Sequence, residues 1–131
     1  MPVLSVTSVC AAVFAIMIAA LSLQVSLRRV KLGGIDFGDG DDTTLRRRIR
    51  AHGNFIEYAP LAVVCVGLLE IQKAPENLVL GIAFSFVLTR IVHAAGMLLA
   101  STPTLRAIAM MIQHVTFLTV AGSLLYLQHG R

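Results

Sequence analysis

The sequence predicts an all-α integral membrane protein that folds as a four-helix bundle, and two observations support this expectation. Hydrophobic residues make up 56% of the 131 residues and the mean hydropathy is +0.80, whereas soluble domains are about 45–50% apolar. The apolar residues lie in four segments joined by short polar links, which make consecutive helices antiparallel neighbours.

The four segments predict helices at about 3–30, 45–73, 76–101 and 104–128, which together form one transmembrane domain over 1–131. The first segment carries no charge from Val3 to Leu27 and is long enough to span a bilayer. Because no basic residues precede its apolar run, we do not interpret it as a cleaved signal peptide. Pro75 and Pro103 suit the starts of the third and fourth helices.

The link at 31–44 is rich in glycine and aspartate, which predicts a loop with several turns. Thr43 or Thr44 is the expected N-cap of the helix that follows. Basic residues cluster in this loop and the adjoining helix ends, at Arg28, Arg29, Lys31, Arg46, Arg47, Arg48 and Arg50. Because cytoplasmic loops carry an excess of lysine and arginine, we expect the loop on the cytoplasmic side and both termini on the opposite side.

Several functions are disfavoured by composition. The net charge of +4 resides in these membrane-flanking residues and no nucleic-acid-binding motif accompanies it, so no nucleic-acid partner is expected. Cys10 and Cys65 lie in apolar runs, where thiols mostly behave as small hydrophobic groups, although a redox or nucleophilic role is the alternative. The histidines have no metal-ligand spacing, and no metal is expected.

A polar stripe, defined as Arg50, Asn54 and Glu57, interrupts the second segment. Spaced i, i+4 and i+7, these residues fall within roughly 60° of one another on a helix. Ionisable groups within a membrane span usually face a bundle interior or a watery cavity and indicate a site. Either the helix projects out of the membrane at this end, or the polar side chains are sheltered inside the bundle. We expect a combination of the two. Pairing of Arg90 with Glu57, which would neutralise both charges, is an interpretation of equal weight.

The basic end of the predicted bundle holds more candidate ligand-binding residues than the stripe alone. They are Arg28 or Arg29, Arg50, Asn54, Glu57, Tyr58, Arg90, His93 and Arg106. The excess of arginine favours an anionic ligand held by charge-assisted, bidentate hydrogen bonds, and the glutamate would meet an ammonium group. A peptide-like ligand with two carboxylates and one amine fits these residues.

The segment from Arg50 to Pro60, RAHGNFIEYAP, resembles the second-helix signature of the MAPEG family, the membrane-associated proteins in eicosanoid and glutathione metabolism. Gly38-Asp39-Gly40 lies a short distance upstream, as in the bacterial branch of that family. RIVHAAG, from Arg90 to Gly96, resembles the third-helix motif of the same branch, and Arg106 follows at the family spacing. The resemblance covers nearly the whole chain.

The resemblance implies a homotrimer in a bacterial inner membrane, with glutathione as co-substrate between subunits near the cytoplasmic face. Arg106 matches the arginine that stabilises the glutathione thiolate, and Arg90 is a structural neighbour of the site. The other positions that match glutathione-binding residues of the family are Arg50, Asn54, Glu57, Tyr58 and His93. Either Arg28 or Arg29 matches a further arginine at the end of the first helix, and the alignment leaves open which of the two. The hydrophobic acceptor would enter from the lipid bilayer.

Two function classes therefore remain. The favoured one is a glutathione transferase or peroxidase that conjugates or reduces hydrophobic electrophiles. The alternative is a non-catalytic trimeric scaffold that binds lipid or a partner protein. Met97 favours the scaffold, because it stands where eukaryotic enzymes often have a tyrosine that contacts glutathione, and Ala107 replaces a serine of the prostaglandin-forming branch. A transporter is disfavoured, because the charges near one end give no continuous polar path.

Overall fold

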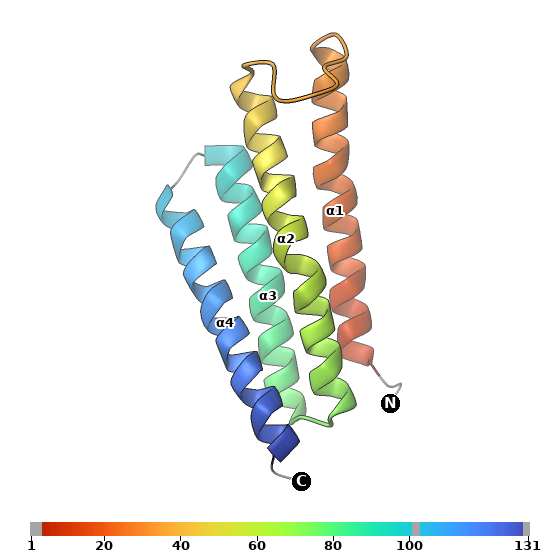
Figure 1. The fold of residues 1–131 in the computed structure, drawn as a ribbon, viewed down its shortest axis with the longest axis vertical. Coiled ribbons are helices and arrows are strands. Elements are labelled where there is room, and N and C mark those ends of the chain that lie inside the picture. Colours follow the sequence, from red (N-terminus) through yellow and green to blue (C-terminus); the bar gives the residue numbers. More distant parts are fainter. Residues whose placement is uncertain (1–3, 101–102, 130–131) are drawn as a thin grey trace.

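The computed structural model describes residues 4–100 and 103–129, which form four α-helices and no strand. The helices are α1 (Ser5–Lys31), α2 (Thr43–Ile71), α3 (Glu76–Ala95) and α4 (Pro103–His129), and a π-helical turn, η1 (Gly96–Ala100), continues α3. They run alternately up and down, so α1 begins and α4 ends opposite the loop that joins α1 to α2 (Figure 1). The predicted all-α four-helix bundle is confirmed.

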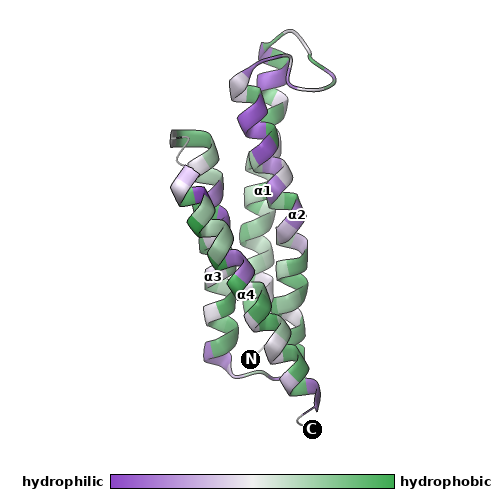
Figure 2. Cartoon of the chain, turned by 60° about the vertical axis from the view of Figure 1, so that its left-hand side comes forward, coloured by the Kyte–Doolittle hydropathy of each residue, from purple (hydrophilic) through white to green (hydrophobic). Residues whose placement is uncertain are grey.

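Each of the four helices is long and apolar enough to cross a membrane. The 29 residues of α2 extend over roughly 43 Å at about 1.5 Å per residue, which exceeds the hydrocarbon thickness of about 30 Å. Hydrophilic residues gather where α1 and α2 approach their connecting loop (Figure 2). The first turns of α2 therefore belong to the head-group region, and the rest of the helix spans the apolar core.

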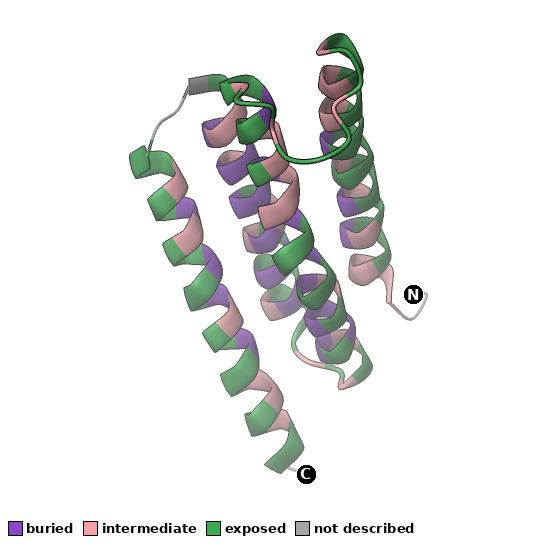
Figure 3. Cartoon of the chain, turned by 45° about the horizontal axis from the view of Figure 1, so that its top comes forward, coloured by how far each residue is buried: buried purple, intermediate pink, exposed green. Residues whose placement is uncertain are grey.

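The two inner helices carry most of the buried surface, whereas α1 and α4 are buried least (Figure 3). Phe14 of α1 meets Phe55 of α2 edge to face at 5.4 Å between ring centroids. The ring centroids of Phe86 of α3 and Phe117 of α4 are 4.8 Å apart. The outward faces of α1 and α4 are apolar, which suits contact with lipid rather than water.

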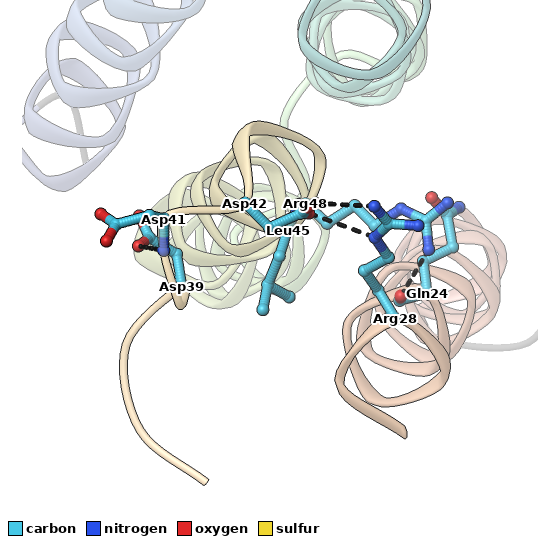
Figure 4. A network of polar contacts seen from close by, with 7 residues as sticks. All are labelled: Gln24, Arg28, Asp39, Asp41, Asp42, Leu45 and Arg48. Atoms are coloured by element: carbon cyan, nitrogen blue, oxygen red, sulfur yellow. Dashed lines mark hydrogen bonds and ion pairs between the residues drawn. The ribbon is translucent and has the colours of Figure 1, made fainter. Parts of the chain in front are cut away.

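The start of α2 is fixed by Asp42, and the expectation of a threonine N-cap is wrong. The Asp42 carboxylate accepts a hydrogen bond from the Leu45 backbone N–H at 2.6 Å and also pairs with Arg28 of α1, 2.6 Å from Nη2 (Figure 4). A carboxylate caps better than a hydroxyl here because it can accept from the helix and from the arginine together. Hence α2 begins at Thr43 rather than at 45.

The loop before this cap is held by the same kinds of contact. Arg29 donates to the Ile35 carbonyl at 2.8 Å, and Arg46 pairs with Asp39. Gly40 has a φ of +54°, a left-handed conformation that favours glycine, and a Cβ there would press on the end of the Ile35 side chain. The polar contacts tie α1, the loop and α2 into one unit. The predicted link at 101–102 and the expected helix start at 3 lie outside the described residues.

At the opposite end, Glu70 of α2 caps the first turn of α1. Its carboxylate accepts from the backbone N–H groups of Val6, at 3.0 Å, and Thr7, at 2.7 Å. Free N–H groups at a helix N-terminus favour a negative charge. Since Asp42 joins the same two helices at the other end, α1 is fixed to α2 at both ends of the bundle.

The Asp42 contacts predict a pH-dependent contribution to stability. The hydrogen bond from Arg28 is the main reason that the pKa of Asp42 is lowered from 3.8 to about 2. The stabilisation is therefore complete above pH 3.8 and is lost as the pH falls through about 2. Asp42→Asn should lower the unfolding temperature by a few degrees at neutral pH, and this difference should vanish towards pH 2, as followed by circular dichroism in detergent.

Asp36→Asn is the matched control, because Asp36 is exposed in the same loop and makes no hydrogen bond to other described residues. Equal losses in both variants, or a loss that does not change with pH, would contradict the assigned role of Asp42.

Candidate functional site

The centre of the candidate site is Arg90 of α3, the largest fully buried side chain, with 1% of its surface exposed. Its Nη1 donates to the Asn54 side-chain oxygen at 2.7 Å, and its guanidinium carbon lies 5.1 Å from the centroid of the Tyr58 ring. Both partners come from α2. An amide oxygen and a ring face offer only partial negative charge, so they orient the guanidinium without neutralising it.

The fourth helix contributes a thioether to the same point. Met110 Sδ lies 3.4 Å from Arg90 Nη2 and 3.9 Å from the Asn54 side-chain nitrogen. A thioether sulfur is a weak acceptor. Three helices thus converge on Arg90, and none of them supplies a formal negative charge there.

A second arginine lies near the start of α4. Arg106 is half-buried, and its Nη1 donates to the sulfur of Met97 at 2.7 Å. Met97 belongs to η1, and π-helical turns of this kind are frequent at functional sites. His93, 8% exposed, lies within electrostatic range of both Arg90 and Arg106. We call Asn54, Tyr58, Arg90, His93, Met97 and Arg106 the arginine site.

The arginine site has no acidic partner within the described part of the chain. The ion pairs formed by residues 4–100 and 103–129 involve Arg28 and Arg46 only. The interpretation that Arg90 pairs with Glu57 is wrong, because Asn54 takes the Arg90 hydrogen bond and Glu57 is exposed. Glu57 forms no ion pair with any described residue.

Two nitrogen atoms of the site are also without partners. The Nε–H groups of Arg90 and Arg106 are buried and donate no hydrogen bond to any described residue. A buried donor that lacks an acceptor typically costs about 1–3 kcal/mol, and more on a charged group. Both arginines are therefore incompletely satisfied, which is the arrangement expected of a site that receives an anion.

The rest of the polar stripe faces outwards. Arg50 and Glu57 are exposed and Asn54 is half-buried, so the chain alone shelters only the middle of the stripe. Glu57 lies near the middle of α2, at a depth where lipid would be an unfavourable neighbour for a carboxylate. The described residues of this chain do not cover the Glu57 carboxylate at that depth.

Arg28 and Arg29 lie elsewhere. Arg28 is paired with Asp42, and Arg29 donates to the Ile35 carbonyl, so both are engaged in holding the first loop. The structure therefore brings together Asn54, Tyr58 and Arg90, with His93 and Arg106 beside them. It leaves Arg28, Arg29, Arg50 and Glu57 outside this cluster.

Three residues near the site, all on α4, were not predicted to belong to it from the sequence. Gln113, fully buried on α4, accepts a hydrogen bond from Thr89 of α3 at 2.6 Å, one residue from Arg90 along the chain. A glutamine within an apolar span was the available signal, because polar groups join helices in membranes. Nothing in the sequence marked Met110 as a neighbour of Arg90. His114 packs edge to face on the Tyr58 ring at 5.9 Å.

The chemistry open to this cluster follows from its atoms. Two guanidinium groups, an imidazole and a thioether suit an anionic ligand, including one that carries sulfur. Among residues 4–100 and 103–129, no three His, Cys, Asp or Glu side chains lie close enough together to hold a metal ion. Cys10 and Cys65 are buried away from the cluster in the apolar core.

Comparison with known proteins gives two consistent findings. The MAPEG family model matches residues 6–126. Inner membrane protein YecN of Escherichia coli strain K12 is 31% identical over 88 residues, which cover 65% of this chain and 67% of that protein. YecN of Escherichia coli O6:H1 matches with the same identity and coverage.

The Arg90 contacts predict that Asn54 stabilises the bundle. Asn54→Ala removes the acceptor of the Arg90 Nη1 hydrogen bond, and the unsatisfied buried donor should lower the free energy of unfolding by about 1–3 kcal/mol. Unfolding in mixed micelles at increasing denaturant gives this quantity. The control is Asn77→Ala, since Asn77 is exposed at the start of α3. Equal stability of the two variants would mean that Arg90 does not depend on Asn54.

Proposed function

This chain belongs to the MAPEG family, and from that premise we propose that it is an inner-membrane glutathione transferase or peroxidase for hydrophobic electrophiles. The observation that carries the proposal is the arginine site, where two arginines lie in the bundle without a carboxylate partner. Glutathione brings two carboxylates, one ammonium group and a thiol, and it would supply the missing negative charge.

Arg106 is the proposed catalytic residue. Its Nη1 now donates to a thioether, and a thiolate at the same place would accept a stronger, charge-assisted hydrogen bond. Stabilising the charged form lowers the pKa of the thiol and raises the fraction present as the nucleophile. Met97 Sδ would give up its position to the glutathione sulfur.

The proposed reactions then follow ordinary thiolate chemistry. With a carbon electrophile, the thiolate donates its electron pair to form a C–S bond, and the leaving group departs with the pair of the broken bond. With a hydroperoxide, the thiolate attacks the terminal peroxide oxygen and the O–O bond breaks, so that the sulfur becomes a sulfenic acid and the leaving alkoxide takes up a proton to form an alcohol. A second glutathione then displaces water from the sulfenic acid to give the disulfide. The acceptor would approach from the lipid phase, because the outer faces of α1 and α4 are apolar.

A homotrimer completes the proposed site. Glu57 is exposed at membrane depth, and Arg50 is exposed about two turns nearer the head groups; a neighbouring copy of the chain would cover both. In that arrangement Glu57 meets the glutathione ammonium and Arg50 a carboxylate, with Tyr58 and His93 at the inner side. We place the loop between α1 and α2 on the cytoplasmic side, because its arginines follow the distribution typical of cytoplasmic loops.

One observation favours a second function. Met97 fills the place beside Arg106 with its own sulfur, so the site is occupied without any ligand thiol. A trimeric scaffold that binds lipid or a partner protein, without turnover, would tolerate this occupancy.

Glutathione binding by titration calorimetry tests the proposal. The wild-type protein in detergent should bind glutathione, and both Arg50→Ala and Glu57→Gln should weaken binding about tenfold or more, because each removes a charge-assisted contact worth about 1.5–3 kcal/mol. Arg46→Ala is the control, since it removes the same charge at an exposed position already paired with Asp39.

Thioether formation with a hydrophobic electrophile is the second readout on the same samples. Binding with turnover supports the transferase. Binding without turnover favours the scaffold, and no binding at millimolar glutathione would contradict both the ligand and the catalytic assignment.

A further inference from the structure

A second polar hollow lies at the loop end of the bundle, apart from the arginine site. It has a volume of about 260 Å³ and lies among α1, α2 and η1. Its lining residues are Gln24, Thr44, Arg47, Arg48, Leu98 and Leu99. One wall is therefore basic and hydrogen-bonding, and the other wall is formed by two leucines.

Neither Arg47 nor Arg48 forms an ion pair with residues 4–100 or 103–129. Their neighbours Arg28 and Arg46 are neutralised by Asp42 and Asp39. Arg48 is oriented by one hydrogen bond, from Nη1 to the Gln24 carbonyl at 2.9 Å, and that carbonyl carries no formal charge (Figure 4). Arg47 is exposed and makes no hydrogen bond to any described residue. Asp42, which is paired with Arg28, also attracts Arg48 without forming an ion pair with it, so both guanidinium groups of the hollow remain able to bind an anion.

The position of the hollow along α2 indicates which layer of the membrane it contacts. Thr44, Arg47 and Arg48 belong to the first two turns of α2, a helix about 13 Å longer than the hydrocarbon core. These turns therefore lie among lipid head groups when the helix spans the membrane. The leucines of η1 reach the same level from α3, at the boundary between the head groups and the acyl chains.

We propose that this hollow binds the phosphate of an anionic phospholipid. Guanidinium groups bind phosphate oxygens bidentately, and basic pockets between transmembrane helices on the cytoplasmic side bind such head groups. The leucine wall favours a lipid over a free phosphate ion, because the glycerol and upper acyl carbons of a lipid would cover it. Neither Arg47 nor Arg48 belongs to the arginine site, so the inference goes beyond the proposed function.

Native mass spectrometry of protein released from micelles tests the proposal with phosphatidylglycerol as the probe and phosphatidylcholine as the neutral comparison. The wild-type protein should retain phosphatidylglycerol preferentially. Arg47→Gln combined with Arg48→Gln should reduce that retention about tenfold or more. Arg46→Gln with Arg29→Gln is the matched control, because it removes the same net charge at the same end of the bundle but leaves the lining of the hollow intact.

The single variant Arg47→Gln guards against misfolding, because its side chain contacts no other described residue through a hydrogen bond. It should lose part of the retention while unfolding at the wild-type temperature. Equal retention by the hollow double variant and the control double variant would overturn the proposal. Displacement of the lipid by millimolar inorganic phosphate would assign the hollow to the free ion and overturn the lipid.

Discussion

Burial of the Arg90 guanidinium without a carboxylate is the constraint on which the rest of the site depends. Asn54, Tyr58 and Met110 orient it from α2 and α4, yet they leave its charge and its Nε unsatisfied. An uncompensated cation is unfavourable at membrane depth, so its partner has to be supplied. Arg106 also has a buried Nε that forms no hydrogen bond with the described residues.

Two sets of charged residues lack a partner in this chain, and one ligand could satisfy both. Inside the bundle, Arg90 and Arg106 lack an anion. Outside it, Arg50 and Glu57 lack cover. A ligand between copies of the chain would satisfy both at once, because its carboxylates and thiolate face the arginines while its ammonium faces Glu57.

Sequence periodicity and composition predicted the four helices and the all-α fold, because long apolar segments have few alternatives in a membrane. The polar residues of the second and third apolar segments also predicted that Asn54, Tyr58 and Arg90 lie at the same end of the bundle. The Asp42 cap was not predicted, since threonine and aspartate both cap helices and only the position of Arg28 decides between them. Sequence spacing did not decide whether Asn54 or Glu57 contacts Arg90. The choice depends on how α2 is rotated about its axis relative to α3, and both residues lie on the same stripe of α2.

The central claim is that the arginine site holds glutathione as a thiolate. Calorimetry in buffers of different ionisation enthalpy measures the protons released on binding. At neutral pH, the wild-type protein should release about one proton per glutathione, because the bound thiol ionises beside Arg106. Arg106→Ala should still bind glutathione with little proton release, and S-methylglutathione should release none. Equal proton release by the wild-type protein and Arg106→Ala would contradict the assignment of Arg106.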